Sequence, residues 1–247
     1  MWDKSKKFGK IGVFSAYEEI RSIMQKVVTD ELDSFSELVY PRDLYKLTDE
    51  LYNENSWAID RPSKGHKYDV SSNISNTFPE LLFDEKPDDS EKYAMIYIKE
   101  KNGRILKWIK QKYLKTPDNF EFYKVFVPKA NGSGAIGETL SNPVIGNPNV
   151  GHTLTFLSIG KFETEEEAVN VLKYIKTKFA RTMLGTLKVT QDNPRESWKN
   201  VPMQDFTPDS DIDWSVSVPE IDRQLYAKYG LTDEEIEFIE SMIKPME

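Results

Sequence analysis

The chain has 247 residues, of which 38% are hydrophobic and 30% charged, a composition typical of a globular protein with a substantial core. It contains no cysteine, which excludes disulfide bonds and thiolate zinc sites and fits a reducing cytoplasm. The net charge of −8 argues against nucleic-acid binding by the molecule as a whole. We also expect no membrane partner, because no apolar run approaches the ~20 residues that span a bilayer.

The first half of the chain alternates short periodic segments with irregular ones. A capping box of Ser15 and Glu18 predicts a helix over IRSIMQKVV, and DSFSELVY predicts a short helix that ends at Pro41. Residues 53–89 are rich in Asn, Ser, Asp and Pro and predict irregular structure with short strands. Next come a strand at YAMIYI, a turn at Asn102-Gly103, a helix over residues 104–114 and a buried strand at FEFYKVFVP.

The second half carries the clearest helices. A strand at TLTFLSIG precedes a capping box of Thr164 and Glu167, after which one apolar stripe predicts a long helix through Ala168, Val171, Leu172, Ile175, Phe179 and Met183. Ser217 with Glu220 begins a helix that Gly230 ends, and Thr232 with Glu235 begins the last one. We therefore expect an α+β fold of mixed sheets with packed helices, a loop-rich N-terminal half and a helical C-terminal tail.

The most unusual segment is the glycine loop, VPKANGSGAIGE at residues 127–138, which follows a strand. Closely spaced glycines let backbone N–H groups approach a ligand, and Lys129 adds a cation, so phosphate is the expected guest. The loop lacks the Gly-Lys-Ser/Thr ending of a nucleotide P-loop. A plain flexible hairpin is the alternative.

Charge is unevenly distributed along the sequence. Ten basic residues stand against three acids from Lys92 to Lys129, and twelve acids stand against three basic residues after residue 202. Residues 171–191 hold five basic residues and no acid, which predicts a helix whose unopposed cations follow a DNA backbone. Gln191 and Asn193 beyond it have side chains of the type that pairs with adenine. Ordinary solvated faces would give the same pattern.

Signals for chemistry are missing. His66 and His152 lack acidic partners at ligand spacing, and Asp84-Glu-Lys86 stands in the wrong order for a metal-dependent nuclease. The sequence has no Asn/Asp-Pro-Pro-Tyr/Phe tetrapeptide, which holds the flipped base in adenine methyltransferases, no glycine-rich cofactor loop and no G-x-S-x-G elbow. We therefore expect no catalytic residues, no metal and no cofactor in this chain.

The residues from Tyr123 to Met246 resemble a known family. The chain contains, in this order, YKVFVPKANGSGAIGE, NPVIGNP, GHTLTFLSIGKFETEEEAVNVLKYIKTKFARTMLGTLKVTQ and WKNVPMQDFTPDSDIDWSVSVPEIDRQLYAKYGLTDEEIEFIESMIKPM. This succession is similar to the C-terminal, TaqI-like specificity region of type II restriction–modification adenine methyltransferases. DSFSELVY and SKGHKYD extend the likeness more loosely. The resemblance implies double-stranded DNA as partner and a separate catalytic domain, in cis or in trans, that binds S-adenosylmethionine, with an endonuclease in some relatives.

Under this interpretation the chain is one DNA-recognition module, a piece of a longer enzyme or a separate subunit. We expect three parts: residues 1–120, a core specificity segment at 121–200, and an acidic helical tail at 201–247. The candidate DNA-binding residues, chosen for their chemistry, are Lys129, Asn131, Ser133, Gly134, Lys176, Lys178, Arg181, Lys188, Thr190 and Gln191.

Two other functions remain open at this point. One is a protein-interaction or scaffold subunit of a restriction–modification complex, anchored by Trp198 and Trp214 beside the acidic tail. The other is an enzyme with an unrecognised nuclease or hydrolase site in residues 53–89.

Overall fold

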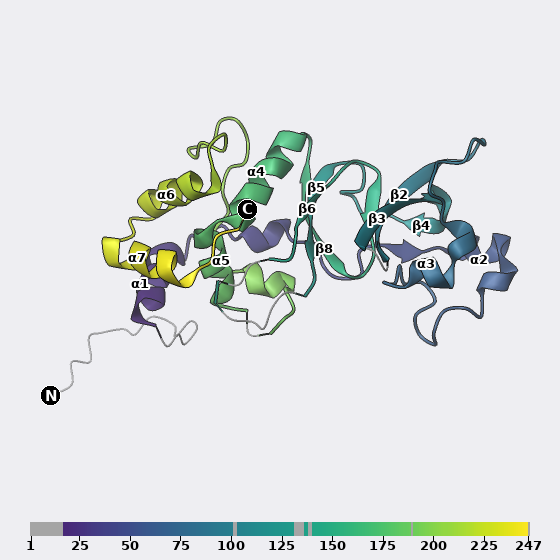
Figure 1. The fold of residues 1–247 in the computed structure, drawn as a ribbon, viewed down its shortest axis with the longest axis horizontal. Helices are drawn as coiled ribbons and strands as arrows, with labels where there is room; N and C mark the ends of the chain where they lie inside the picture. Colours follow the sequence, from purple (N-terminus) through teal and green to yellow (C-terminus); the bar gives the residue numbers. More distant parts are fainter. Residues whose placement is uncertain (1–16, 101–102, 131–135, 138–139, 189, 247) are drawn as a thin grey trace.

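The computed structural model describes residues 17–100, 103–130, 136–137, 140–188 and 190–246. The molecule is elongated, with most helices gathered at one end and a smaller sheet-containing part at the other (Figure 1). We call these parts the large lobe (residues 17–40 and 121–246 without strand β7) and the small lobe (residues 44–120 with β7). Each lobe has its own apolar core, and the fold is α+β.

The small lobe is built on an antiparallel hairpin. Strands β2 (Tyr93–Glu100) and β3 (Gly103–Lys110) pair along their whole length, and β7 (Val150–His152) joins β2 in parallel. A two-stranded ladder, short helices and 3₁₀ turns surround this sheet: β1 (Lys46–Leu47), α2 (Asp49–Glu54), η2 (Ser56–Ala58), α3 (Ile74–Thr77), η3 (Pro79–Leu81), η4 (Gln111–Tyr113) and β4 (Leu114–Lys115).

The helix predicted over residues 104–114 was wrong. The segment forms β3 and then the 3₁₀ turn η4. Ile105, Trp108 and Ile109 fit a helical stripe, but Trp108 instead pairs with Met95 on one side and bridges to Phe83 on the other. Pairing with segments distant in sequence therefore overrode the local spacing.

The large lobe packs helices on a three-stranded antiparallel sheet. Strand β5 (Tyr123–Pro128) lies between β6 (Val144–Gly146) and β8 (Phe156–Phe162). The remaining elements of the lobe are α1 (Glu18–Val27), η1 (Phe35–Leu38), α4 (Glu165–Lys176), α5 (Lys178–Gly185), η5 (Arg195–Trp198), α6 (Val218–Lys228) and α7 (Asp233–Met242).

The strands predicted at residues 93–98, 120–128 and 153–160 are found as β2, as β5 over 123–128 and as β8 over 156–162, and three capping boxes are confirmed. Thr164 with Glu167, Ser217 with Glu220, and Thr232 with Glu235 each exchange bonds at the start of a helix. Gly230, with φ of +61°, follows the end of α6. Helix α1 begins at Glu18 with Tyr17 as its N-cap, so Glu18 is the first helical residue and not the third. The capping box predicted for Ser15 with Glu18 is therefore wrong, although Ser15 itself lies outside the described residues.

The long helix predicted after residue 164 is divided in two. Its apolar stripe is largely buried as expected, but Thr177 has an extended backbone with ψ of 148° and separates α4 from α5. The Thr177 side chain accepts a hydrogen bond from the Ala180 N–H and thereby caps α5. The cations predicted to lie on one continuous helix therefore lie on two, with Lys176 at the end of α4 and Lys178 and Arg181 in α5.

The two cores do not follow the predicted division at residue 120. Helix α1 packs on α7, where Lys26 pairs with Glu235 at 2.6 Å and the Tyr17 ring meets that of Phe238. Phe35 lies in the same core as Trp198. Residues 17–40 thus belong structurally with the C-terminal helices rather than with residues 44–120.

Aromatic rings join the lobes. His152 of β7 lies 4.9 Å from the Tyr45 ring of the small lobe and 4.8 Å from the Phe126 ring of β5. Beside it the buried Lys124 donates to the carbonyl oxygens of Phe120 and Asn147. Among the described residues, no helix is long and apolar enough to cross a membrane.

Candidate nucleic-acid interface

The stem of the glycine loop is held against the segment that follows α5. Ala130 bridges to Asp192, and the Asn193 N–H donates to the Lys129 carbonyl oxygen at 2.8 Å. The exposed side chains of Thr190 and Gln191 directly precede this bridge. Two of the predicted segments, far apart in sequence, are therefore adjacent. Asn131, Ser133 and Gly134 lie outside the described residues.

Two arginines border the same stem. Arg42, in the connection between the lobes, pairs with Asp192 at 2.7 Å. The Arg104 guanidinium lies 4.6 Å above the Phe156 ring, and the neighbouring Thr155 carbonyl oxygen accepts from the Lys129 N–H. We call Arg42, Arg104, Lys129, Thr190 and Gln191 the junction cluster, since they meet where the two lobes join.

The junction cluster carries more positive than negative charge. Arg42 pairs with Asp192, whereas Arg104 lies over the Phe156 ring and has no ion-pair partner among the described residues. Within the described part of the chain, the half-buried Lys129 side chain has no ion-pair partner. Such a cation beside exposed hydroxyl and amide groups suits contact with a phosphate next to a base edge.

The cations of α5 do not form the unopposed face expected for DNA. Arg181 is only 2% exposed and donates to the carbonyl oxygens of Gly137 at 3.1 Å and Lys244 at 2.5 Å. Lys178 pairs with Glu240 of α7 at 2.5 Å. The DNA contacts predicted for these two residues must be corrected: their partners come from the chain itself, and they fasten α5 to the C-terminal segment.

The other two cations of this region are also less accessible than predicted. Lys188 is only 5% exposed, and Lys176 is half-buried at the end of α4. Both have interactions within the protein. Arg181 nevertheless serves the glycine loop indirectly, since its bond to the Gly137 carbonyl oxygen fixes the distal end of that loop.

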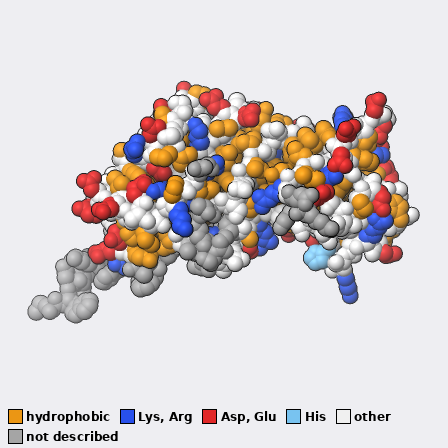
Figure 2. All heavy atoms as spheres, in the orientation of Figure 1, with side chains coloured by type: hydrophobic (Ala, Val, Ile, Leu, Met, Phe, Trp, Pro, Cys, Tyr) orange, Lys and Arg blue, Asp and Glu red, His pale blue; other side chains and the backbone are white. Residues whose placement is uncertain are grey.

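Three basic residues of the segment at residues 92–129, namely Lys107, Lys110 and Lys112, are ion-paired in the folded chain. Lys107 pairs with Asp84, and Lys112 contacts both Glu54 and Glu91 at 2.7 Å. Figure 2 accordingly shows Lys and Arg interspersed with Asp and Glu on the face drawn, without one continuous basic field. On this face, the surplus of charge in this part of the sequence does not form a single basic surface.

Lys124 of the same segment is buried within the protein. Its amine donates to the carbonyl oxygens of Phe120 and Phe122, both at 2.8 Å, and to that of Asn147 at 3.1 Å. Burial lowers the pKa of Lys124 to about 7, while the three carbonyl acceptors oppose that shift because they favour the ammonium. This lysine links the two lobes and does not reach a ligand.

The sequence did not single out Arg42 or Arg104. Arg42 follows a proline in a connection, and Arg104 stands in a segment interpreted as a helix. Their place depends on the pairing of β2 with β3 and on the bridge at Asp192. No periodicity or motif at either arginine would have indicated it.

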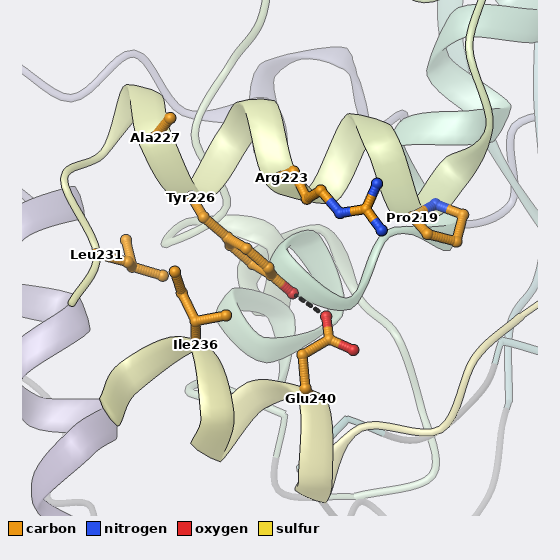
Figure 3. Close-up of a pocket in the computed structure, with 7 residues that line it drawn as sticks. All are labelled: Pro219, Arg223, Tyr226, Ala227, Leu231, Ile236 and Glu240. Carbon is orange, nitrogen blue, oxygen red and sulfur yellow. Dashed lines mark hydrogen bonds between the residues drawn. The ribbon is translucent and has the colours of Figure 1, made fainter. Parts of the chain in front are cut away.

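The hollow between α6 and α7 lies in the acidic tail (Figure 3). Ala227, Leu231 and Ile236 form its apolar side, and the Tyr226 hydroxyl donates to Glu240 at 2.9 Å at the other end. Trp198 and Trp214, the anchors expected for a protein partner, are 0% and 5% exposed. They are core residues, so that anchoring role is corrected.

Neither comparison with known proteins nor a search for metal-binding groups assigns a function to this chain. No family model, curated protein or solved structure matches this chain. In the parts of the chain that the structure describes, no group of three or more His, Cys, Asp or Glu residues is arranged to hold a metal ion. His66 contacts Asp69 at 2.8 Å on the surface.

Proposed function

We propose that this chain is a double-stranded DNA recognition module of a type II restriction–modification adenine methyltransferase and acts in the cytoplasm. It would choose the target sequence and position the base for a catalytic domain, in cis or in trans, which supplies the S-adenosylmethionine. The resemblance of residues 123–246 supports the family. The observation that carries the DNA contact is the junction cluster, where the glycine-loop stem meets Thr190 and Gln191.

The members of the cluster have different roles in this proposal. Lys129 and Arg104 contact phosphates and set the register of the module on the duplex, since backbone contacts carry no sequence information. Gln191 and Thr190 read base edges, because an amide can pair bidentately with adenine and a hydroxyl can donate or accept. Asn131, Ser133 and Gly134 of the glycine loop lie outside the described residues and remain proposed contacts.

The test is the salt dependence of binding to duplex DNA that contains the methylation site. For wild-type chain, the logarithm of the affinity should fall linearly with the logarithm of salt concentration. The double variant Lys129→Ala with Arg104→Ala should reduce that slope by about 1.8, from ~0.9 for each lost phosphate contact. Gln191→Ala should instead change the preference among sequences by roughly 1–3 kcal/mol.

A matched control removes equal charge elsewhere. Lys115 and Lys199 are exposed and lie outside the cluster, so replacing both with Ala should leave the slope close to wild type. An equal loss of slope in this control would show that net charge alone governs binding. Wild-type chain that binds no duplex even at low salt would exclude the proposed function.

The proposal also predicts that the chain alone binds no methyl donor. The sequence lacks both the tetrapeptide that holds the target base and the glycine-rich cofactor loop. Isothermal titration with S-adenosylmethionine should therefore give no heat beyond dilution. Micromolar binding would contradict the assignment of the cofactor to a separate catalytic domain.

A further inference from the structure

Large apolar side chains gather on the surface of the small lobe. Six large hydrophobic residues of the described chain are markedly exposed, and three of them lie between residues 57 and 68: Trp57 at 42%, Ile59 at 49% and Tyr68 at 40%. Water-facing aromatic and branched residues this close in sequence indicate a binding surface, whereas single exposed hydrophobics are ordinary. We call residues 57–68 the aromatic–basic loop.

Cations alternate with these apolar side chains. The loop contains Arg61, Lys64 and Lys67 against one acid, Asp60, so it has a net charge of +2. Lys67 lies over two rings, 4.7 Å from that of Tyr52 and 4.9 Å from that of Tyr68. The two rings restrict the rotamers of this lysine before any ligand binds. Its side chain therefore loses less conformational entropy when it binds an anion.

The acids around the loop engage only part of its positive charge. Arg61 forms two hydrogen bonds with Glu80, at 2.6 and 2.8 Å, and lies 4.2 Å above the Trp57 ring. This arginine therefore anchors the loop. Lys67 approaches Asp49 only to 3.8 Å, and the exposed Lys64 has no ion-pair partner among the described residues.

The loop continues into the junction cluster through the backbone. It ends beside Val70, whose carbonyl oxygen accepts from the Leu154 N–H at 3.0 Å. The next residue, Thr155, accepts from the Lys129 N–H at 2.8 Å. One short stretch of chain thus connects the loop of the small lobe to the glycine-loop stem of the large lobe.

We propose that the aromatic–basic loop is a second element that contacts the phosphate backbone of duplex DNA, with Lys64 and Lys67 as the contacting cations and Trp57 and Tyr68 packed along the sugar edge. The inference rests on the proposed DNA function and extends it to the small lobe. The two lobes would then hold the duplex from neighbouring positions. These contacts add affinity and orientation, and they contribute nothing to sequence preference.

The experiment compares wild-type chain with Lys64→Ala/Lys67→Ala by fluorescence anisotropy on a labelled duplex at several salt concentrations. Loss of two phosphate contacts should reduce the slope of log affinity against log salt by about 1.8 and weaken cognate and unrelated duplexes by the same factor. Circular dichroism and thermal melting check that the small lobe still folds. The matched control Lys86→Ala/Lys115→Ala removes two exposed lysines of the same lobe and should leave the slope unchanged.

Trp57 supplies an independent readout. Its emission should change when wild-type chain binds duplex, and Trp57→Phe should abolish that change while retaining most of the affinity. If wild-type chain binds duplex and the loop variant has the same salt slope, the loop inference is overturned and the proposed function stands. The same conclusion follows if the control variant loses as much slope as the loop variant. Absence of duplex binding by wild type would remove both, and a preference for single strands would show that the rings stack on bases instead.

Discussion

Arg181 shows how the surroundings of a side chain decide its role. Its position on a basic, apparently unopposed segment predicts a phosphate contact, yet its guanidinium donates to carbonyl oxygens at residues 137 and 244. Both acceptors are more than forty positions away in sequence. No local pattern reveals such partners. Lys129, by contrast, is half-buried and has no ion-pair partner among the described residues, and its phosphate contact stays a prediction.

Arg181→Ala is expected to destabilise the fold by about 2–4 kcal/mol, because buried carbonyl oxygens lose their donors and a large side chain leaves a cavity. Urea unfolding followed by circular dichroism measures this loss. Lys199→Ala, at an exposed position, should change stability by less than ~0.5 kcal/mol. An Arg181→Ala chain with wild-type stability but weaker DNA binding would restore the original phosphate contact.

His152 is predicted to make the fold sensitive to acid. Burial lowers its pKa from 6.5 to about 4, so between these values the unfolded chain binds a proton that the folded chain does not. The contribution of His152 to the free energy of unfolding is fully present above pH 6.5 and is lost as the pH falls from 6.5 through 4. The total loss is about 3 kcal/mol.

The measurement is urea unfolding of wild type and His152→Gln from pH 7 to pH 4. The variant should be less stable at pH 7 because it disturbs the packing with Tyr45 and Phe126. The difference between the two proteins should then shrink as the pH falls, since Gln does not titrate. Parallel curves over the whole range would contradict the prediction.

At the scale of elements, local signals succeeded where a helix end is determined by neighbouring residues. The boxes at Thr164, Ser217 and Thr232 are local exchanges of hydrogen bonds and were predicted correctly. The division between α4 and α5 at Thr177 was not predicted, because part of the N-terminal cap of α5 comes from another helix. Asp222 of α6 accepts from the backbone N–H groups of Lys178 and Phe179 at 3.0 and 2.9 Å.

Asp222→Ala should therefore cost about 2 kcal/mol, the upper range for loss of a helix cap, because two buried N–H groups lose their acceptor. Burial raises the pKa of Asp222 from 3.8 to about 6, so the folded chain binds this proton more tightly than the unfolded chain does. The stability that this proton contributes is present below pH 3.8 and is lost as the pH rises through 6. Unfolding at pH 5 and pH 8 should show this difference. The exposed Asp209→Ala is the control, and an equal effect there would contradict the cap.

At the scale of the whole molecule, the sequence predicted the class of fold and the tail helices better than the arrangement of its parts. The α+β class is confirmed, and in the tail Ile221, Leu225, Ile239 and Ile243 are buried while Ile236 is half-buried. The association of residues 18–39 with the C-terminal helices and the position of Arg42 and Arg104 depend on packing between distant segments. Periodicity contains no information about those contacts.

Truncation after Tyr229 should destabilise the large lobe by about 3–6 kcal/mol, from the loss of Ile239 and Ile243 as buried side chains. The truncated chain should melt at lower temperature and bind a fluorescent probe of exposed apolar surface. Glu237→Gln is the control, since it changes the charge of α7 without changing its buried face. An unchanged melting temperature would mean that α7 is dispensable.

The closure of the large core by α7 also affects the order in which the chain can fold during synthesis. The small-lobe core uses residues 45–120, whereas the large-lobe core includes Ile23 and Phe35 near its start and Ile243 near its end. Domains generally fold as units as they emerge from the ribosome, so the small lobe can largely assemble while translation continues. The early helix α1 must wait for its partner until about 200 more residues have been made, roughly 10–40 s at ~5–20 residues per second. Chaperones that cover exposed apolar helices during translation should therefore bind the segment at residues 18–39.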